Sequence, residues 1–260
     1  MFIRSFIILI ISLIGSSSIV LSQGFDWVYS WNSPFKSPRV FIGAYGGSGI
    51  SKECNSPNTF SDVVSCCKLS EGSGTTFKTG ITAEYWILGT YSLQATVGYG
   101  KETSNFHNER ADSILVLENK RYVPKKMTRS FDLTYSGHSL DLGLIGKTRI
   151  ASTHISIATG FTCSFPTIFS FETNVNTTYK VDGLNLDLEK SYPEQIPNDL
   201  IKRSAVLFKP MIRSEFDIAL QKGLYLKPYL QADYTLNSRI TDAPWNSWAV
   251  LGGISLLFGY

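Results

Sequence analysis

Residues 246–260, at the end of the sequence, form an apolar stretch with a period of two. Its even positions carry bulky side chains apart from Gly252, whereas its odd positions are mostly small. Successive side chains of a β-strand point to opposite faces, so this pattern predicts a strand with one apolar face. An apolar strand left at a sheet edge exposes unpaired backbone groups, whereas a closed membrane barrel pairs its last strand with its first. The stretch therefore favours a membrane barrel.

Seven more stretches alternate in the same way, at 39–49, 76–88, 91–102, 129–148, 152–164, 205–220 and 224–239. We therefore predict an all-β chain that forms a single eight-stranded antiparallel up-and-down transmembrane β-barrel with long outer loops. Both faces of 39–49 are apolar, which leaves its inward face unassigned. In 129–148 the apolar parity changes between Tyr135 and Leu140, which predicts a β-bulge around residues 136–139.

The connections between these stretches alternate between long and short. Those at 50–75, 103–128 and 165–204 are long, and the others have only a few residues. Outer-membrane barrels have short periplasmic turns and longer outer loops, so the pattern fits that class. The apolar run 113–117 inside the second long connection predicts that the third and fourth strands continue above the membrane as a hairpin.

A soluble secreted β-sandwich or lipocalin-like barrel would also alternate. Three features favour the membrane. Full charges lie at mid-strand positions, several strands reach the spanning length of about ten residues, and aromatic residues lie near strand ends as in interfacial girdles. These aromatic residues are Tyr85, Tyr91, Tyr99, Trp248 and Tyr260. Charged residues are 17% of the chain, below the roughly 25% usual for soluble proteins.

The beginning of the sequence predicts export. Arg4 precedes an apolar run that is too short for a spanning helix, and small residues around Ser22 fit a cleavage site. We therefore predict a signal peptide over 1–22, a periplasmic lead-in over 23–38, and the barrel over 39–260. The net charge of +3 is too small to predict a nucleic-acid partner.

The C-terminal stretch resembles the β-signal of bacterial outer-membrane proteins, with the candidate signal residues Gly252, Ile254, Leu256, Phe258 and Tyr260. The whole mature chain resembles the eight-stranded outer-membrane barrels of the OmpX-like and OmpA-transmembrane-like group, within the outer membrane protein beta-barrel domain families. The resemblance implies a location in the bacterial outer membrane, contact with its lipids, recognition by the barrel-assembly machinery, and a monomer. It does not imply one function, because that group includes structural, adhesive and enzymatic members.

The parity of the strands predicts a set of inward charges. They are Lys78, Glu84, Asp132, Asp141, Lys147, Lys209, Arg213, Glu215, Asp217, Lys227 and Asp233. The interior of an eight-stranded barrel is just wide enough for its side chains, and buried charges must be paired or hydrated. We therefore expect a plug of ion pairs, with a proton or ion path as the alternative.

No catalytic, cofactor-binding or metal-binding residue is predicted. His154-Ile155-Ser156 matches the His-x-Ser motif of a deacylase family of barrels, but it follows a periplasmic turn, whereas that family's site faces the outer leaflet. His138 is interpreted as a hydrogen-bonded lumen histidine and His107 as a loop histidine. No nucleotide, zinc-protease or serine-hydrolase fingerprint is present.

The four cysteines are Cys54, Cys66, Cys67 and Cys163. Export permits disulfides, and the adjacent pair lacks the spacing of a zinc site. Because adjacent cysteines rarely bond each other, we predict that Cys54 joins one of the pair and that the other joins Cys163 across the outer rim. Cys163 facing lipid as a free thiol remains the alternative for the second bond.

The second long connection carries a cationic cluster of Lys120, Arg121, Lys125, Lys126 and Arg129. It is interpreted as a solvated loop, with binding to anionic lipid headgroups or to a surface polymer as the alternative. The sequence as a whole favours a structural or surface-interaction barrel. The other hypotheses are a narrow pore or transport accessory and a lipid-modifying enzyme.

Overall fold

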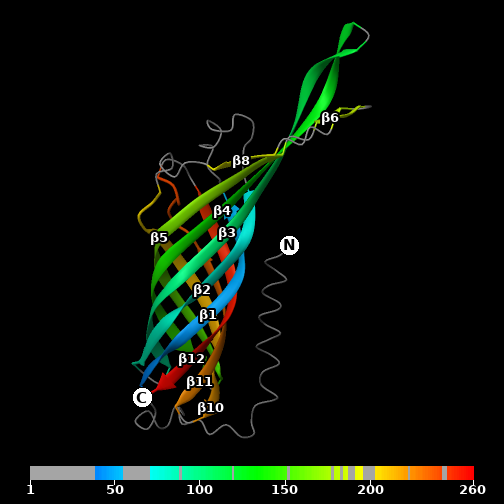
Figure 1. Ribbon diagram of the computed structural model, residues 1–260. Helices are drawn as coiled ribbons and strands as arrows, with labels where there is room; N and C mark the ends of the chain where they lie inside the picture. The colour runs from blue at the N-terminus through cyan, green and yellow to red at the C-terminus, as the bar shows by residue number, and fades with distance from the viewer. Residues whose placement is uncertain are drawn as a thin grey trace. The chain divides into compact units, whose positions relative to one another are not determined.

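The computed structural model describes residues 39–54, 71–87, 90–118, 120–150, 153–176, 179–181, 184–186, 191–195, 203–221, 223–241 and 245–260 (Figure 1). The predicted signal peptide, the lead-in, and Cys66 and Cys67 lie outside these residues. Among the described residues, no helix is long and apolar enough to cross a membrane.

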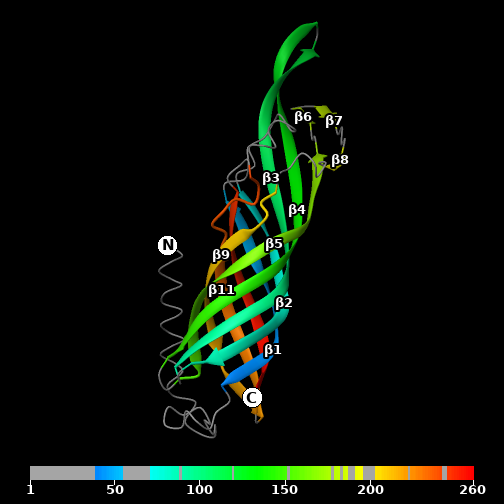
Figure 2. The same ribbon diagram turned by 90° about the vertical axis from the view of Figure 1, so that its left-hand side faces the viewer.

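The described strands close into an antiparallel barrel with a ring of eight strands, as predicted (Figures 1 and 2). Each strand pairs with its neighbours in the ring, and β12 pairs with both β11 and β1, so the ring has no open edge. β9 and β10 are two parts of one ring position and flank Asp217. The ring consists of β1 (Val40–Cys54), β2 (Glu71–Trp86), β3 (Tyr91–Glu118), β4 (Arg121–Arg149), β5 (Ile155–Asn176), β9 (Leu207–Phe216) with β10 (Ile218–Gln221), β11 (Leu224–Tyr234) and β12 (Asn246–Gly259).

Side chains alternate between a polar interior and an apolar exterior. In β2, Lys78, Thr82 and Glu84 are buried inside, whereas Ile81 and Tyr85 point outward. Side chains alternate in the same way in the other strands of the ring. The outward ones form an exposed apolar belt that includes Val97, Leu142, Leu144, Ile157, Phe161, Ile212, Leu230, Ile254 and Leu256. In β1, whose inward face the sequence left unassigned, Phe41, Tyr45, Ser51 and Glu53 are buried. An apolar exterior around a charged interior is the arrangement of a membrane-spanning barrel.

Glycines in the wall make room for two inward tyrosines. A Cβ atom added to Gly98 would lie 2.2 Å from the hydroxyl oxygen of Tyr45. One added to Gly253 would lie 2.4 Å from the Cζ atom of Tyr229. Such approaches are far below a normal contact, so the rings of these tyrosines lie over the neighbouring strands only because those strands have no side chain there.

The predicted bulge lies in a different strand. Pairing of β4 with β5 shifts between His138 and Ser139, whose partners are Ile168 and Pro166, so the extra residue is Thr167 of β5. In β4 the inward parity continues from Leu133 and Tyr135 to the far end of the strand. We call the end of the lumen opposite the end of β12 the outer mouth. The change in apolar parity along β4 therefore marks the point where apolar side chains no longer face lipid and instead line this outer mouth.

Much of what was predicted as loop is strand. β3 and β4 have 28 and 29 residues and remain paired up to Glu118 and Arg121, so the connection predicted at 103–128 is mainly a long hairpin. The expected extension of the third and fourth strands is thereby confirmed, and it projects beyond the end of the barrel opposite the end of β12 (Figures 1 and 2). The third connection, predicted as a loop over 165–204, contains the end of β5, its partner β8 (Ser191–Gln195), and the small sheet of β6 (Tyr179–Val181) with β7 (Leu184–Leu186). Backbone groups outside a membrane also need partners, and pairing satisfies them without an apolar pattern in the sequence.

Closure through β12 leads to the first prediction. Removing residues 256–260 deletes the pairs of Leu256 with Ala44 and of Phe258 with Ile42. We expect this truncated protein not to reach a heat-modifiable folded form in detergent micelles, because β1 and β11 are left without a partner at the inner end.

The matched control keeps the backbone and changes the outward side chains, as Leu256→Ala with Phe258→Ala. We expect it to fold in micelles but to accumulate in the periplasm of cells, because these side chains belong to the predicted β-signal for assembly. Normal folding of the truncated protein would show that closure does not depend on this segment.

Candidate functional site in the lumen and at the outer mouth

The inner end of the lumen, where β12 finishes, contains a branched network of ion pairs centred on Glu84. Its Oε2 atom lies 3.1 Å from the Nζ atom of Lys147 and 2.9 Å from that of Lys227, and Ser92 donates to Oε1 at 2.9 Å. Lys227 also lies 3.3 Å from a carboxylate oxygen of Asp217. These five residues come from β2, β3, β4, β11 and the junction of β9 with β10, so the network ties distant strands together across the lumen.

Further members extend this inner network at both ends. Arg149 pairs with Asp217 at 2.9 Å, and its guanidinium lies 4.4 Å from the ring centroid of Trp86. Lys147 also pairs with Glu215, whose other oxygen lies 3.2 Å from Nη1 of Arg213. All of these charged side chains are buried or nearly so.

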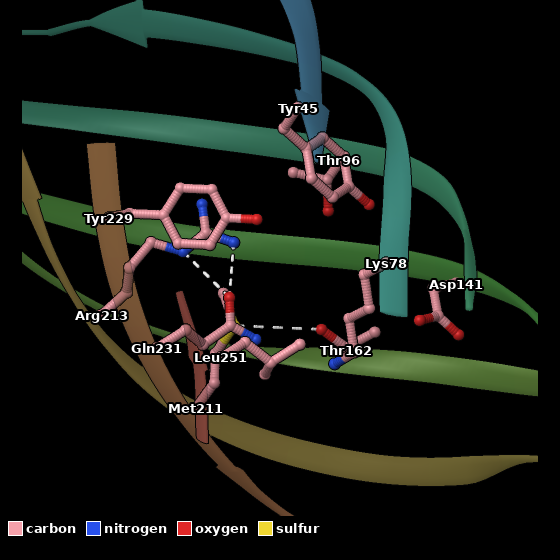
Figure 3. A pocket seen from close by; sticks show the side chains of 10 residues that line it. All are labelled: Tyr45, Lys78, Thr96, Asp141, Thr162, Met211, Arg213, Tyr229, Gln231 and Leu251. Carbon is pink, nitrogen blue, oxygen red and sulfur yellow. Dashed lines mark hydrogen bonds between the residues drawn. The ribbon is translucent and has the colours of Figure 1, made fainter. Parts of the chain in front are cut away.

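The middle of the lumen is occupied by Arg213 and its partners (Figure 3). Arg213 donates from Nε and Nη2 to Gln231 at 3.0 and 2.6 Å, and its guanidinium lies 4.5 Å from the ring centroid of Tyr229. Gln231 donates to Asp233 at 3.1 Å, and Lys78 donates to the same oxygen at 2.7 Å. The network therefore continues from the inner end to mid-barrel.

A small cavity adjoins this middle part, lined by Tyr45, Lys78, Thr96 and Asp141 among others (Figure 3). Ser139 donates to Oδ1 of Asp141 at 2.8 Å, whereas the buried Oδ2 atom has no hydrogen-bond partner within the described part of the chain. A buried carboxylate oxygen of this kind, next to a cavity, is a suitable partner for a bound water.

The outer mouth holds a second cluster around Arg239. Its Nη2 atom lies 2.5 Å from Glu102 and its Nε atom 3.4 Å from Glu53, while Lys209 pairs with Glu102 at 2.7 Å. Trp245 donates from Nε1 to Glu53 at 2.8 Å. This outer cluster joins β1, β3, β9 and the segment between β11 and β12.

Four aromatic rings cover the outer cluster. The ring centroid of Trp245 lies 5.8 Å from that of Phe106, 5.2 Å from that of Tyr135 and 6.3 Å from that of Phe169. All four side chains are buried, and the guanidinium of Arg239 lies within 6 Å of the rings of Tyr135 and Trp245. The mouth is therefore filled by packed side chains.

The lumen charges balance. Among the described residues the interior holds seven cations and seven anions, namely Lys78, Lys147, Arg149, Lys209, Arg213, Lys227 and Arg239 against Glu53, Glu84, Glu102, Asp141, Glu215, Asp217 and Asp233. Equal numbers are expected, because a buried charge without an opposite charge beside it has a large desolvation cost. An arrangement with no excess charge provides paired contacts between strands but no selective path for one sign of ion.

Ten of the eleven predicted lumen charges lie in the lumen, and Asp132 does not. Asp132 is 41% exposed and pairs with His107 at 2.6 Å on the outward face of the hairpin. The prediction for Asp132 is wrong because it assumed a bulge in β4, which the strand does not have. His138, interpreted as a lumen histidine, is also on the outward face, where its Nδ1 atom contacts the hydroxyl of Tyr99. His107 lies in β3 and not in a loop.

Four lumen charges were missed from the sequence. Glu102 and Arg149 lie at strand ends with the parity of their inward neighbours, so extending the alternation by one position would have found them. Arg239, the last residue of the predicted strand 224–239, has the parity of Asp233 and would have been found in the same way. Glu53 fell outside the predicted strands and Trp245 lay in a connection, so no periodic signal marked these two.

The His-x-Ser motif lies at the inner end, as the sequence analysis had placed it. Asp217 donates its backbone N–H to the carbonyl of His154, whose ring lies 5.6 Å from that of Phe216. Partial burial lowers the pKa of His154 below its ordinary value. Ser156 is fully buried, which closes its hydroxyl off from a substrate in solution.

The described residues include two of the four cysteines, Cys54 and Cys163. These two do not bond each other, and Cys163 shares the outward face of β5 with Phe161. β5 continues to Asn176, but its pairing with β9 ends at Ser164, next to Cys163. The bond of Cys163 to Cys66 or Cys67 stays a prediction, with the lipid-facing free thiol as its alternative. Whether Cys54 bonds Cys66 or Cys67 stays a prediction, because those two residues lie outside the described ones.

The hairpin leaves the ring as a two-stranded ribbon. β3 pairs with β2 only up to Phe106, and β4 pairs with β5 only up to Asp132. We call residues 108–131 the outer ribbon and residues 113–126 its tip. At the tip, Leu115 faces Pro124, Leu117 faces Tyr122, and Lys120 adopts a φ of 64° in the turn. A positive φ in a two-residue hairpin loop matches the right-handed twist of the strands.

The closed ring, the apolar belt and the charged lumen together define a transmembrane β-barrel. No protein-family model matches the chain, and no curated protein matches it significantly. Two solved structures with likeness to it are Neisserial surface protein A (12% identity, TM-score 0.31, 85% of this chain and 97% of the other) and the Ail attachment invasion locus protein of Yersinia pestis (10%, 0.34, 85% and 99%). A third is the outer membrane protease OmpT of Escherichia coli (8%, 0.35, 85% and 97%). At such identities and scores these likenesses carry no inference about function.

The inner network leads to the second prediction. Replacing Glu84 with Gln keeps the size of the side chain but leaves Lys147 and Lys227 without their shared carboxylate. We expect the free energy of unfolding to fall by about 3–5 kcal/mol, because an uncompensated charge remains buried. Urea titration of the protein refolded in micelles measures it.

Asp132→Asn is the matched control, because its ion pair with His107 is solvent-exposed. We expect this change to cost no more than about 1 kcal/mol. Equal losses in the two variants would show that the lumen charges do not stabilise the barrel through pairing.

Proposed function

We propose that the protein is a closed outer-membrane barrel that holds the outer ribbon above the cell surface as an interaction element. The observation that carries this proposal is the length of β3 and β4, which have 28 and 29 residues. A tilted strand needs only about 9–11 residues to cross the membrane. More than half of each strand is therefore available outside the bilayer.

The filled lumen supports an anchoring role over a transport role. Paired charges occupy the lumen from Arg149 at the inner end to Arg239 at the mouth, and the rings around Trp245 cover the mouth. A permeant ion would have to displace groups that satisfy one another in a low-dielectric interior. The pairing also stiffens the base from which the ribbon extends.

The outer surface of the ring supports the expected lipid and assembly partners. The exposed belt around Leu142 and Leu230 would contact the acyl chains of the membrane. The candidate signal residues Ile254, Leu256, Phe258 and Tyr260 are exposed on the outward face of the last strand, and Gly252 lies beside them. This face would be accessible to the barrel-assembly machinery before closure.

Protease treatment of intact cells tests the location and orientation. Lys120 and Arg121 are exposed at the tip, so trypsin added outside should cut there and leave the paired ring intact. A variant with Gln at Lys120, Arg121, Lys125 and Lys126 should resist this cut. Cleavage of the tip only after the outer membrane is permeabilised would contradict the proposed orientation.

Planar-bilayer recording tests the closed lumen. We expect the wild-type protein to show no steady open channel, because the lumen charges are paired and the mouth is covered. Replacing Arg239 and Trp245 with Ala should produce brief openings, since both are part of the cover at the mouth. A large, steady conductance of the wild-type barrel would favour the narrow pore as its function.

A further inference from the structure

The tip of the outer ribbon combines exposed apolar side chains with a concentrated positive charge. Leu115, Leu117 and Tyr122 are 68%, 60% and 72% exposed. Leu117 and Tyr122 are directly opposite each other, and Leu115 lies two positions along the same strand, so all three share one face of the ribbon. Monomeric proteins rarely place several large apolar side chains together in water without a partner for them.

The net positive charge of the full sequence equals the net charge of this tip. The chain has 24 Lys and Arg residues and 21 Asp and Glu residues. The tip holds four of the former, Lys120, Arg121, Lys125 and Lys126, and only Glu118 of the latter. The rest of the chain is therefore neutral, and the net charge of +3 resides in one short hairpin. Such a charge attracts an anionic partner.

We infer that the tip inserts into the surface of an anionic lipid bilayer that faces the cell; this inference rests on the proposed function. Aliphatic and aromatic side chains would enter the headgroup region, with the flanking cations held at the level of the phosphates. This partner uses both properties of the tip at once. A soluble polyanion would use the cations and leave Leu115, Leu117 and Tyr122 in water.

The cell's own outer leaflet is a poor candidate for this bilayer. The ribbon extends from Asn108 to Glu118 beyond the last pairing of β3 with β2, which at about 3.3 Å per residue is roughly 35 Å. The apolar belt of the ring lies below that point. The tip is therefore held well above the membrane in which the ring would sit, and the lipid surface must be an apposed one.

Strand addition and self-association explain the tip less well. Pro124, Lys125 and Lys126 lie in the outer part of β4, and proline and lysine are the residues that natural edge strands use against pairing. Two tips of the same protein would bring together two groups with a net positive charge. Repulsion between the positive charges thus disfavours binding of a second copy. The proline and lysines at the edge of β4 disfavour pairing with an added strand.

Vesicle co-flotation tests the inference, with the full-length protein held in phosphatidylcholine nanodiscs so that its apolar belt is covered. We expect binding to vesicles that contain phosphatidylglycerol and not to vesicles of phosphatidylcholine alone. Each cation replaced by Gln should weaken binding by about fivefold. Replacing Leu115, Leu117 and Tyr122 with Ser should weaken it by more than about tenfold per leucine.

Leu236→Ser is the matched control, since Leu236 is 61% exposed and lies outside the ribbon. Its binding should equal that of the wild type. Insertion is read directly with Tyr122→Trp, whose added indole should be quenched by brominated phosphatidylglycerol beyond the signal of the wild-type protein.

Three results would overturn the inference. They are an absence of binding to anionic vesicles, binding that survives the three serine substitutions, and full competition by dextran sulphate without quenching of the added indole. The last two would assign the tip to a charged polymer, and dimeric nanodisc complexes without vesicle binding would assign it to a second copy. None of them affects the cleavage and conductance tests, so failure of this inference is distinguishable from failure of the proposed function.

Discussion

Closure of the sheet is the constraint on which the rest of this structure depends. A strand in hydrocarbon has no water to satisfy its backbone, so every strand of the ring needs two neighbours. β12 completes the ring through continuous pairing with β1, from Phe41 with Gly259 to Cys54 with Asn246. With the ring closed, the period of two along each strand separates two environments. One face meets lipid, and the other lines a lumen too narrow for bulk water.

The narrow lumen in turn explains the charges. A single buried charge would be very costly, yet the interior holds carboxylates, ammonium groups and guanidinium groups from β1, β2, β3, β4, β9 and β11. Most of them are tolerated because an opposite charge lies beside them, as Lys147 and Lys227 do beside Glu84, whereas Asp141 accepts a hydrogen bond from Ser139. Pairs that connect residues far apart in the sequence, such as Lys78 with Asp233, also fix the relative positions of their strands. The network therefore stabilises one register of the barrel as well as filling it.

Beyond the lipid belt, the same strands follow other rules. Leu133 and Tyr135 turn inward and pack with Phe106 and Trp245, because above the membrane the apolar side chains gain by leaving water. Farther out, the outer ribbon has no ring to pack against, and Leu115, Leu117 and Tyr122 stay exposed. One continuous pair of strands thus serves as membrane wall, mouth lining and surface projection.

The sequence by itself determined the class of fold and most of the lumen. The alternation in 205–220 and 224–239 was enough to place Lys209, Arg213, Glu215, Lys227 and Asp233 inside, because side-chain parity is a local property of a strand. It could not place Asp132 or His138. Their environments depend on where the extra residue of the bulge sits, and this is set by the pairing of β4 with β5, which leaves out Thr167. The partners of Arg239 and Trp245 could not be predicted either, because contacts across a closed ring join residues far apart in the sequence that no periodic pattern relates. Only the tertiary structure decided which charges meet and how far the hairpin stays paired beyond the membrane.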